Sequence, residues 1–169
     1  MVGIEEKKLA GTKIGREDIE KGRVIYTRWR PDASYSWAAG VAMGRYLSEL
    51  KKGRLVGVRC KSCRRVMIPP RVFCELCFKP VDEWVYLGDT GKVNTYAVSY
   101  IAADASRIKK PVIPAVIEID GASKGMGILH LLGEVDPEKV RVGMRVKAVW
   151  RPEEERQGAI TDIKYFKPL

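Results

Sequence analysis

The sequence is poor in the residues and motifs from which enzymes commonly build an active site. Among its 169 residues there is a single histidine, His130, and it lies in the apolar run Ile128–Leu132. The sequence holds no Gly-x-Ser-x-Gly, P-loop or Gly-x-Gly-x-x-Gly motif. A covalent mechanism needs a nucleophile beside a base, and no such pair can be picked out. We therefore interpret His130 as an ordinary strand residue, exposed or satisfied by a hydrogen bond, and predict a chain that is not itself an enzyme.

Long apolar segments are missing as well. No apolar run approaches the ~20 residues that a membrane-spanning helix requires. No apolar stretch follows the charged N-terminal residues, as it would in a secretory signal. Together with a charged-residue content of 31%, these absences predict a soluble, cytoplasmic protein that does not use a membrane.

Acidic residues are scarce in one segment of the chain. The formal net charge is +10, and residues 51–79 hold nine lysines and arginines against one acid, Glu75. Residues 80–169 hold thirteen residues of each sign and are neutral. The positive charge therefore gathers in the segment that also contains all four cysteines, and it favours an anionic ligand or an acidic partner there.

The four cysteines form the most specific motif, Cys60-x2-Cys63-x10-Cys74-x2-Cys77. Each pair can place two thiolates on one tight turn, and four sulfurs at ~2.3 Å complete a closed tetrahedron around Zn²⁺. A closed shell leaves no position for water, so the predicted zinc is structural. Two alternatives stay open, a rubredoxin-like iron site and a redox-active dithiol. We favour zinc because nothing else in the sequence indicates electron transfer.

The residue after the second cysteine of each pair departs from the usual pattern. Knuckles of this kind usually carry glycine there, because the backbone needs a positive φ. Arg64 and Phe78 occupy the two positions. The sequence therefore predicts a slightly strained site, or a metal that is lost more easily.

The rest of the chain predicts a mainly β protein. Short segments rich in Val, Ile, Tyr and Thr, separated by turn residues, favour an OB-fold barrel of five or six strands. The strand candidates are residues 84–87, 91–101, 112–119, 127–135, 145–150 and 159–166. The predicted organisation is an extended arm (1–35), a helix (36–53), a zinc ribbon (54–83) and an OB-fold (84–169).

The predicted helix has an apolar face formed by Trp37, Val41, Leu47 and Leu50, and Gly53 is a suitable stop. An aromatic cluster lies at the end of the arm and the start of the helix. It covers the edge of the core or docks a partner, since aromatic residues are enriched at interfaces. Its rings belong to Trp29, Tyr35 and Trp37.

The segments Leu50–Cys63 and Pro69–Cys77 resemble a known family of acyl-CoA-associated OB-fold proteins, long labelled a domain of unknown function. The resemblance implies an N-terminal helical segment, a rubredoxin-like zinc ribbon and a C-terminal OB-fold. It also implies partnership with thiolases. An archaeal member bridges acetoacetyl-CoA thiolase and hydroxymethylglutaryl-CoA synthase in the mevalonate route, and bacterial members accompany a thiolase-like aldolase. The high Lys, Glu and Arg content is typical of thermophiles and favours the archaeal role.

A non-catalytic scaffold that helps to position acyl-CoA would need a basic surface, because coenzyme A carries phosphates. Arg107, Lys109 and Lys110, in the expected loop before Pro111, are candidate phosphate contacts, with the thioester shared with the partner enzyme. A second set lies in the ribbon. The alternative for both sets is a solvated face or contacts to an acidic partner. The ribbon set is Arg59, Lys61, Arg64, Arg65 and Arg71.

A nucleic-acid-binding module is the alternative function, since zinc ribbons and OB-folds both occur in such proteins. Two features argue against it. The expected barrel is neutral, and its aromatic residues Tyr96 and Tyr100 are not interleaved with lysine or arginine as a stacking groove requires. The scaffold function is therefore favoured.

Overall fold

The computed structural model describes residues 11, 13–27, 36, 38–102 and 104–169. The chain divides into two compact units, Met1–Ser36 and Trp37–Leu169. The aromatic cluster of Trp29, Tyr35 and Trp37 lies outside the described residues, so its role stays a prediction. No helix in the described part of the chain is long and apolar enough to cross a membrane.

The first unit contains a short helix, α1 (Arg16–Glu20), where the sequence predicts an extended arm. Local polar contacts account for the difference. The Asp18 carboxylate accepts the Gly15 N–H at 2.8 Å and pairs with the Arg23 guanidinium at 2.7 Å. No residue of α1 is buried, so this helix depends on its own caps and surface ion pairs, which contribute only a few tenths of a kcal/mol each.

The second unit begins with α2 (Gly40–Lys51), which is shorter than the predicted helix of residues 36–53. The predicted apolar face is partly wrong, because Val41 is 77% exposed. Burial instead follows the i, i+4, i+7, i+8 stripe of an amphipathic helix. That stripe includes one acid, Glu49. Burial by itself would raise the pKa of Glu49, but its contacts with Lys52 and Arg54 lower that pKa. The buried residues are Ala42, Tyr46, Glu49 and Leu50.

Three strands follow as an antiparallel sheet in the order β2-β1-β3: β1 (Leu55–Arg59), β2 (Val66–Met67) and β3 (Glu83–Leu87). The sequence assigns residues 84–87 to the barrel, but as part of β3 they pair with β1. Almost all of the central strand β1 is buried, so its backbone polar groups require hydrogen-bond partners, and pairing with β3 supplies them on one side. Its neighbour β2 also approaches closely, since a Cβ at Gly57 would lie 2.6 Å from the Met67 carbonyl oxygen.

The barrel is a five-stranded antiparallel sheet in the order β10-β9-β4-β7-β8. A parallel bridge between Leu132 and Phe166 joins the two edges of this sheet. There the Gly133 N–H donates to the Phe166 carbonyl at 2.9 Å. This confirms a mainly β fold in which an OB-like sheet follows the ribbon. The described part of the barrel also contains the 3-10 helices η1 (Pro137–Lys139), η2 (Glu153–Glu155) and η3 (Ile160–Asp162). The strands are β4 (Thr90–Tyr96), β7 (Pro114–Ile119), β8 (Gly127–Leu131), β9 (Arg145–Trp150) and β10 (Ile163–Pro168).

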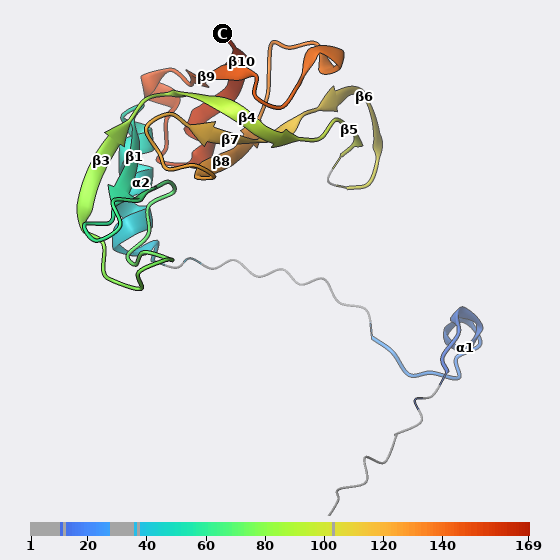
Figure 1. Cartoon of the computed structure of the whole chain (residues 1–169). Coiled ribbons are helices and arrows are strands. Elements are labelled where there is room, and N and C mark those ends of the chain that lie inside the picture. Colours follow the sequence, from blue (N-terminus) through green and yellow to red (C-terminus); the bar gives the residue numbers. More distant parts are fainter. Residues whose placement is uncertain (1–10, 12, 28–35, 37, 103) are drawn as a thin grey trace, which may run out of the picture. The chain divides into compact units, whose positions relative to one another are not determined.

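A separate hairpin of β5 (Ser99–Ile101) and β6 (Arg107–Val112) corrects two predictions. Residues 91–101 are not one strand but divide into β4 and β5, and the expected loop before Pro111 is strand β6. A run of Lys-Lys-Pro hides the strand pattern, whereas the cross-strand pairing of Ser99 with Val112 defines it. Figure 1 shows the hairpin at the end of the barrel away from β1 and β3.

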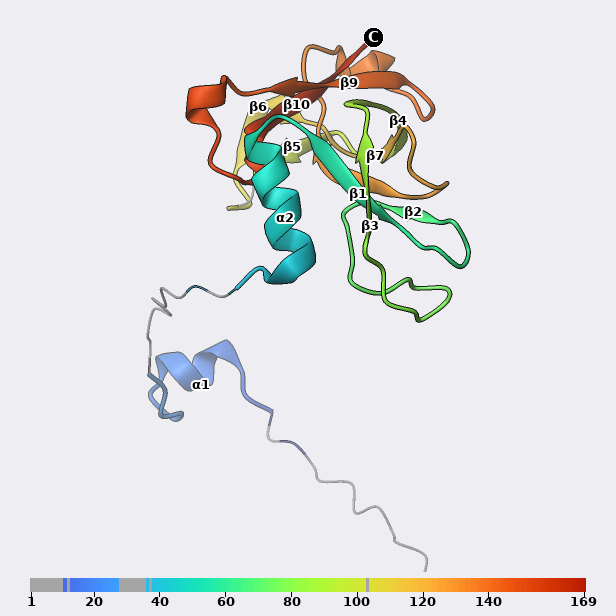
Figure 2. The same cartoon turned by 90° about the vertical axis from the view of Figure 1, so that its left-hand side faces the viewer.

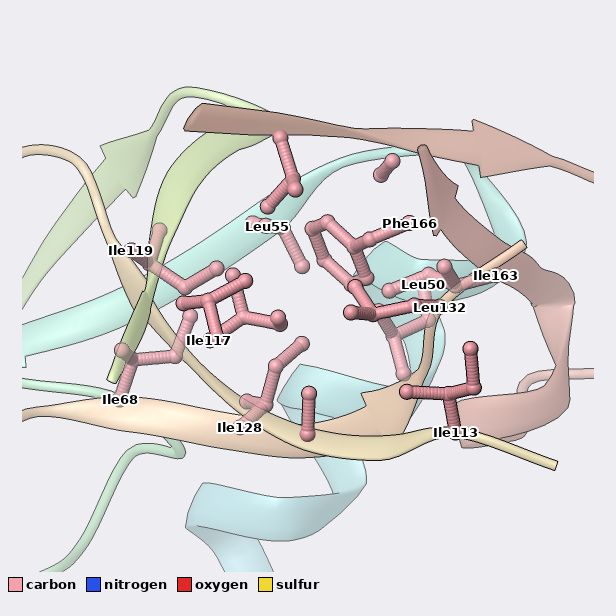
Figure 3. Packing of buried hydrophobic residues seen from close by; sticks show 14 of the residues in the cluster. Leu50, Leu55, Ile68, Ile113, Ile117, Ile119, Ile128, Leu132, Ile163 and Phe166 are labelled. Carbon is pink, nitrogen blue, oxygen red and sulfur yellow. The ribbon is translucent and has the colours of Figure 1, made fainter. Parts of the chain in front are cut away.

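The second unit has one main hydrophobic core, shown in Figure 3. Leu50 from α2 and Leu55 from β1 pack there with Ile117 and Phe166 of the barrel. A smaller cluster lies behind the cysteines, and Trp84 packs against both clusters. Figure 2 shows β1 running from the barrel into the ribbon, alongside α2. The ribbon and the barrel therefore share buried surface and form one body. The smaller cluster consists of Val58, Cys60, Met67, Cys74 and Val81.

Candidate functional site

Two turns of the same shape carry the four cysteines. The Arg64 N–H donates to the Cys60 carbonyl at 2.8 Å, and the Phe78 N–H donates to the Cys74 carbonyl at 2.9 Å. The N–H of each first cysteine also donates to the carbonyl five residues later, at 2.8 Å from Cys60 and 3.0 Å from Cys74. The Cys-x2-Cys spacing therefore forms two matching knuckles, each closed by two backbone hydrogen bonds.

The knuckles bring the four sulfur atoms together. The Sγ atoms of Cys60, Cys63, Cys74 and Cys77 all lie within 4.8 Å of one another, and those of Cys63 and Cys74 are 3.6 Å apart. None of the four is in a disulfide. A tetrahedral site with Zn–S bonds of ~2.3 Å has sulfur–sulfur edges of about 3.8 Å. The sulfur positions thus fit a tetrahedral ion bound by four thiolates.

Hydrogen bonding makes the sulfur atoms unequal. The backbone N–H of Cys63 is the main cause that lowers the pKa of the Cys60 thiol to about 7. A hydrogen bond with Cys63 is the main cause that raises the pKa of the Cys77 thiol to about 12. Four negative charges at these distances repel one another, so the cluster retains protons unless a cation replaces them. The chemistry of the group fits a divalent metal that displaces protons as it binds.

Both knuckles contain a residue in the left-handed backbone region. The φ angle is 63° at Arg64 and 53° at Phe78. These are the two positions where the sequence pattern calls for glycine, so the expected departure has the expected backbone consequence. A side chain in this conformation costs on the order of 1 kcal/mol. Both side chains are exposed, and neither is stabilised there by burial in the described core.

Most of the basic ribbon side chains are paired with acids. Arg65 contacts Glu75 at 2.6 Å, and Arg71 approaches the same carboxylate at 3.6 Å. Burial alone would raise the pKa of Glu75, but a hydrogen bond from its own backbone N–H and the two cations lower it. Arg59 and Lys61 pair with acids that follow the second knuckle, Glu83 and Asp82. Of the five cations proposed in the ribbon, Arg64 alone has no acidic partner among the described residues.

The second set of predicted cations lies on β6. Arg107, Lys109 and Lys110 are all exposed, and none forms an ion pair with a residue that the structure describes. The nearby Asp104 instead accepts the Ser106 N–H at 3.0 Å. The structure therefore brings the three cations together on one strand, at the end of the barrel away from β1 and β3 (Figure 1).

Both ring nitrogens of His130 contact polar backbone groups. Its Nε2 lies 3.2 Å from the Ile160 carbonyl oxygen, and its Nδ1 accepts the Leu131 N–H at 2.9 Å. The ring also packs edge-on against Phe166, with a centroid distance of 5.8 Å. A histidine with both nitrogens engaged in this way serves as part of the barrel closure.

Sequence reasoning missed an apolar groove between α2, β8 and η3. Two adjoining hollows of 440 and 410 Å³ share Leu129 and Ile160 in their walls. Tyr46 also lines the groove, and its buried hydroxyl has no hydrogen-bond partner among the described residues. The groove is built from three distant segments. Its one local signal, exposed Leu129 beside buried Ile128, is hidden in a run that is apolar except for His130.

The loop before η3 that lines this groove is held by one buried carboxylate. Asp162 accepts the backbone N–H groups of Gln157, Gly158 and Ala159 at 2.9, 2.7 and 3.1 Å. Although burial would raise the pKa of Asp162, these hydrogen bonds lower it. The groove wall is thus anchored by backbone hydrogen bonds to a charged group.

Comparison with family models covers the ribbon and most of the barrel. Residues 47–83 match the model described as "ChsH2, rubredoxin-like zinc ribbon domain". Residues 84–151 match the model described as "ChsH2, C-terminal OB-fold domain". The boundary between the two matches falls inside β3 (Glu83–Leu87), the strand that pairs with the ribbon.

Curated relatives include a "DUF35 domain-containing scaffold protein" of Methanocaldococcus jannaschii, 36% identical over 118 residues, which cover 68% of this chain and 82% of the relative. The protein of the same name from Methanothermobacter thermautotrophicus is 27% identical, with 68% and 86% covered. A "Probable enoyl-CoA hydratase alpha subunit" of Thermomonospora curvata is 28% identical over 100 residues. The match covers 59% of this chain and 30% of that subunit.

A solved structure described as "Ltp2-ChsH2(DUF35) aldolase" shares the fold, with a TM-score of 0.55 and 22% identity over 82% of this chain and 98% of the other. A DUF35-family protein of unknown function from Sulfolobus solfataricus superposes with a TM-score of 0.56 at 25% identity, covering 65% and 78%. The two knuckles and the OB-like sheet agree with the two matched family models, and the alignment covers 82% of the Methanocaldococcus jannaschii relative. The chain belongs to the DUF35 family of scaffold proteins, with the zinc-ribbon and OB-fold domains of ChsH2.

Proposed function

We propose that this chain is a cytoplasmic, non-catalytic scaffold subunit that joins a thiolase to a hydroxymethylglutaryl-CoA synthase and helps to position acyl-CoA between them, in the mevalonate route. The observation that carries the proposal is the 36% identity to the Methanocaldococcus jannaschii scaffold protein over 118 residues, 68% of this chain. The relative named as an enoyl-CoA hydratase subunit supports a place beside an enzyme that acts on acyl-CoA. The aldolase complex supports an enzyme partner.

The proposed metal is one structural Zn²⁺ bound by Cys60, Cys63, Cys74 and Cys77. The support is the group of four sulfur atoms, all within 4.8 Å of one another, on two matching turns. Four protein ligands fill a tetrahedral shell, which leaves no site where water could be activated. In this proposal the metal stabilises the ribbon and takes no part in chemistry.

The proposed contacts to the phosphates of coenzyme A are Arg107, Lys109 and Lys110. Three cations within four residues of one strand give a high local positive charge, and no acid among the described residues neutralises it. Phosphate groups favour such sites because each contact is a charge-assisted hydrogen bond. The thioester itself would be held by the partner enzyme, whose active site supplies the chemistry.

The proposal is tested by reconstitution from purified components. The zinc-loaded full chain is mixed with the thiolase and with the synthase of the source organism, separately and together, and each mixture is run on size-exclusion chromatography with light scattering. We expect stable complexes, and no turnover of acyl-CoA by the isolated chain. Failure of the chain to bind either enzyme, or thiolase activity from the pure chain, would reject the scaffold function.

The nucleic-acid alternative is tested with the same protein. Gel-shift titrations with single-stranded DNA and RNA at about 0.15 M salt should show no tight binding. Tight, salt-sensitive binding together with no binding to either enzyme would favour that alternative.

A further inference from the structure

The second knuckle presents apolar side chains to solvent. Phe73 is 55% exposed, Leu76 is 63% exposed and Phe78 is 82% exposed, and Val72 beside them is also exposed. We call these four residues the knuckle patch. Isolated apolar side chains on a surface are ordinary, but four within seven residues of a small rigid turn form a group of the kind that marks an interaction site.

Phe78 is costly where it stands. Its φ of 53° is a conformation in which glycine has no steric penalty, whereas a phenylalanine costs on the order of 1 kcal/mol. Its ring recovers little of that cost, because most of it faces solvent. Glycine at this position would therefore make the isolated ribbon more stable. The phenylalanine ring has a stabilising role only if another molecule contacts it.

The surroundings of the patch are basic. Lys79 follows Phe78 directly, and Arg64 occupies the equivalent strained position of the other knuckle; neither has an acidic partner among the described residues. An apolar centre with a charged rim is the usual anatomy of a protein–protein contact, and aromatic anchors carry much of the binding energy. The sign of the rim favours a partner surface with carboxylates.

We propose that the knuckle patch is the docking contact of this chain on its partner enzyme, with the Phe78 ring inserted into an apolar hollow rimmed by carboxylates. The metal-binding knuckles then fix the Phe78 ring in its exposed position on the surface of the ribbon. This inference rests on the proposed function for the existence of the enzyme partner, and it deepens that function by naming the surface that recognises it.

The test uses two variants that relieve the same backbone strain. Both Phe78→Gly and Arg64→Gly place glycine at a positive φ, so each should keep or raise the midpoint of thermal unfolding. Binding of the zinc-loaded chain to the purified thiolase and synthase is measured by isothermal titration calorimetry. We expect Phe78→Gly to weaken binding to one of these enzymes about 10- to 100-fold, and Arg64→Gly to weaken it about threefold or less.

A third variant tests whether a loss of binding comes from the lost side chain or from a changed backbone in the knuckle. Leu76→Ser keeps the backbone and removes a second apolar side chain of the patch, and we expect an intermediate loss of affinity. Binding by the wild-type chain should also weaken as salt is raised from about 0.05 to 0.5 M, since salt screens the basic rim.

The outcomes separate this inference from the proposed function. Wild-type affinity in Phe78→Gly and Leu76→Ser, while the wild-type chain binds an enzyme, overturns the knuckle patch alone. Absence of binding by the wild-type chain overturns both. Concentration-dependent self-association of the wild-type chain in sedimentation, lost in Phe78→Gly, would show that the patch receives a second copy, and it also overturns the inference.

Discussion

The ribbon and the β5–β6 hairpin are both basic segments, but they use their charge differently. In the ribbon, Arg59, Lys61 and Arg65 pair with Glu83, Asp82 and Glu75. In the hairpin, none of the three cations on β6 has an acidic partner among the described residues. Paired charges fix a local structure, whereas unpaired charges remain available to a ligand. Most of the ribbon charges therefore stabilise the ribbon itself, whereas the β6 charges stay available to a ligand.

The largest expected effect is loss of a cysteine. Cys74→Ser removes a buried thiolate from the closed shell, and structural zinc contributes roughly 10–16 kcal/mol of binding in small zinc domains. We expect metal content to fall from about one zinc per chain to near zero, and the unfolding midpoint to fall sharply. Metal analysis and thermal unfolding measure both quantities. Full occupancy by iron, or a stable metal-free protein with two disulfides, would contradict the zinc assignment.

The next effect concerns the close approach of β1 and β2. Gly57→Ala places a methyl group against the Met67 carbonyl, at 2.6 Å before relaxation, and we expect a loss of about 2–3 kcal/mol in the free energy of unfolding. Gly44→Ala is the matched control, because a methyl group there meets no atom within 4 Å and α2 gains about 1 kcal/mol from the better helix former. Chemical denaturation should give opposite signs. Equal effects would mean that β1 and β2 do not pack as closely as described.

Acid should weaken the proposed metal site of the ribbon. The four thiols bind protons in competition with zinc, so the apparent zinc affinity should fall as pH drops through about 7, the pKa of the Cys60 thiol, and more steeply below it. Chelator competition between about pH 8 and 6 measures this affinity. A pH-independent zinc affinity would rule out proton displacement by the metal.

The smallest expected effect is in the hairpin. Lys109→Glu combined with Lys110→Glu should weaken coenzyme A binding to the assembled complex roughly tenfold, or about 1.4 kcal/mol, while the unfolding free energy changes by less than about 0.5 kcal/mol. Lys139→Glu combined with Arg141→Glu is the control, because it makes the same change of net charge at exposed residues outside the hairpin. Equal losses in the two double variants would assign the effect to net charge rather than to β6.

Features that depend on short sequence spacing were predicted well. The Cys-x2-Cys pairs predict two knuckles, and the structure forms two that share one hydrogen-bond pattern. The missing knuckle glycines predict a strained backbone, and Arg64 and Phe78 both have a positive φ. Such features lie within a few residues of chain, so local sterics and hydrogen bonding are enough to specify them.

Features that depend on distant pairing were predicted poorly. The buried face of α2 includes Tyr46 and excludes Val41, because the sheet against which the helix packs selects the face. The strand β3 pairs with β1 instead of opening the barrel, and β6 forms where the sequence favours a loop. In each case the partner lies elsewhere in the chain, and local periodicity carries no record of it.

The sequence by itself determined the ribbon motif, the family and the concentration of charge around the cysteines. Only the tertiary structure decided which of those charges are neutralised, because a carboxylate such as Asp82 or Glu83 reaches Lys61 or Arg59 only after β3 has paired with β1. The same folding leaves Phe78 exposed and the β6 cations without an acidic partner in the part of the chain that the structure describes. Charge counts follow from composition, but free charge and free apolar surface are products of packing.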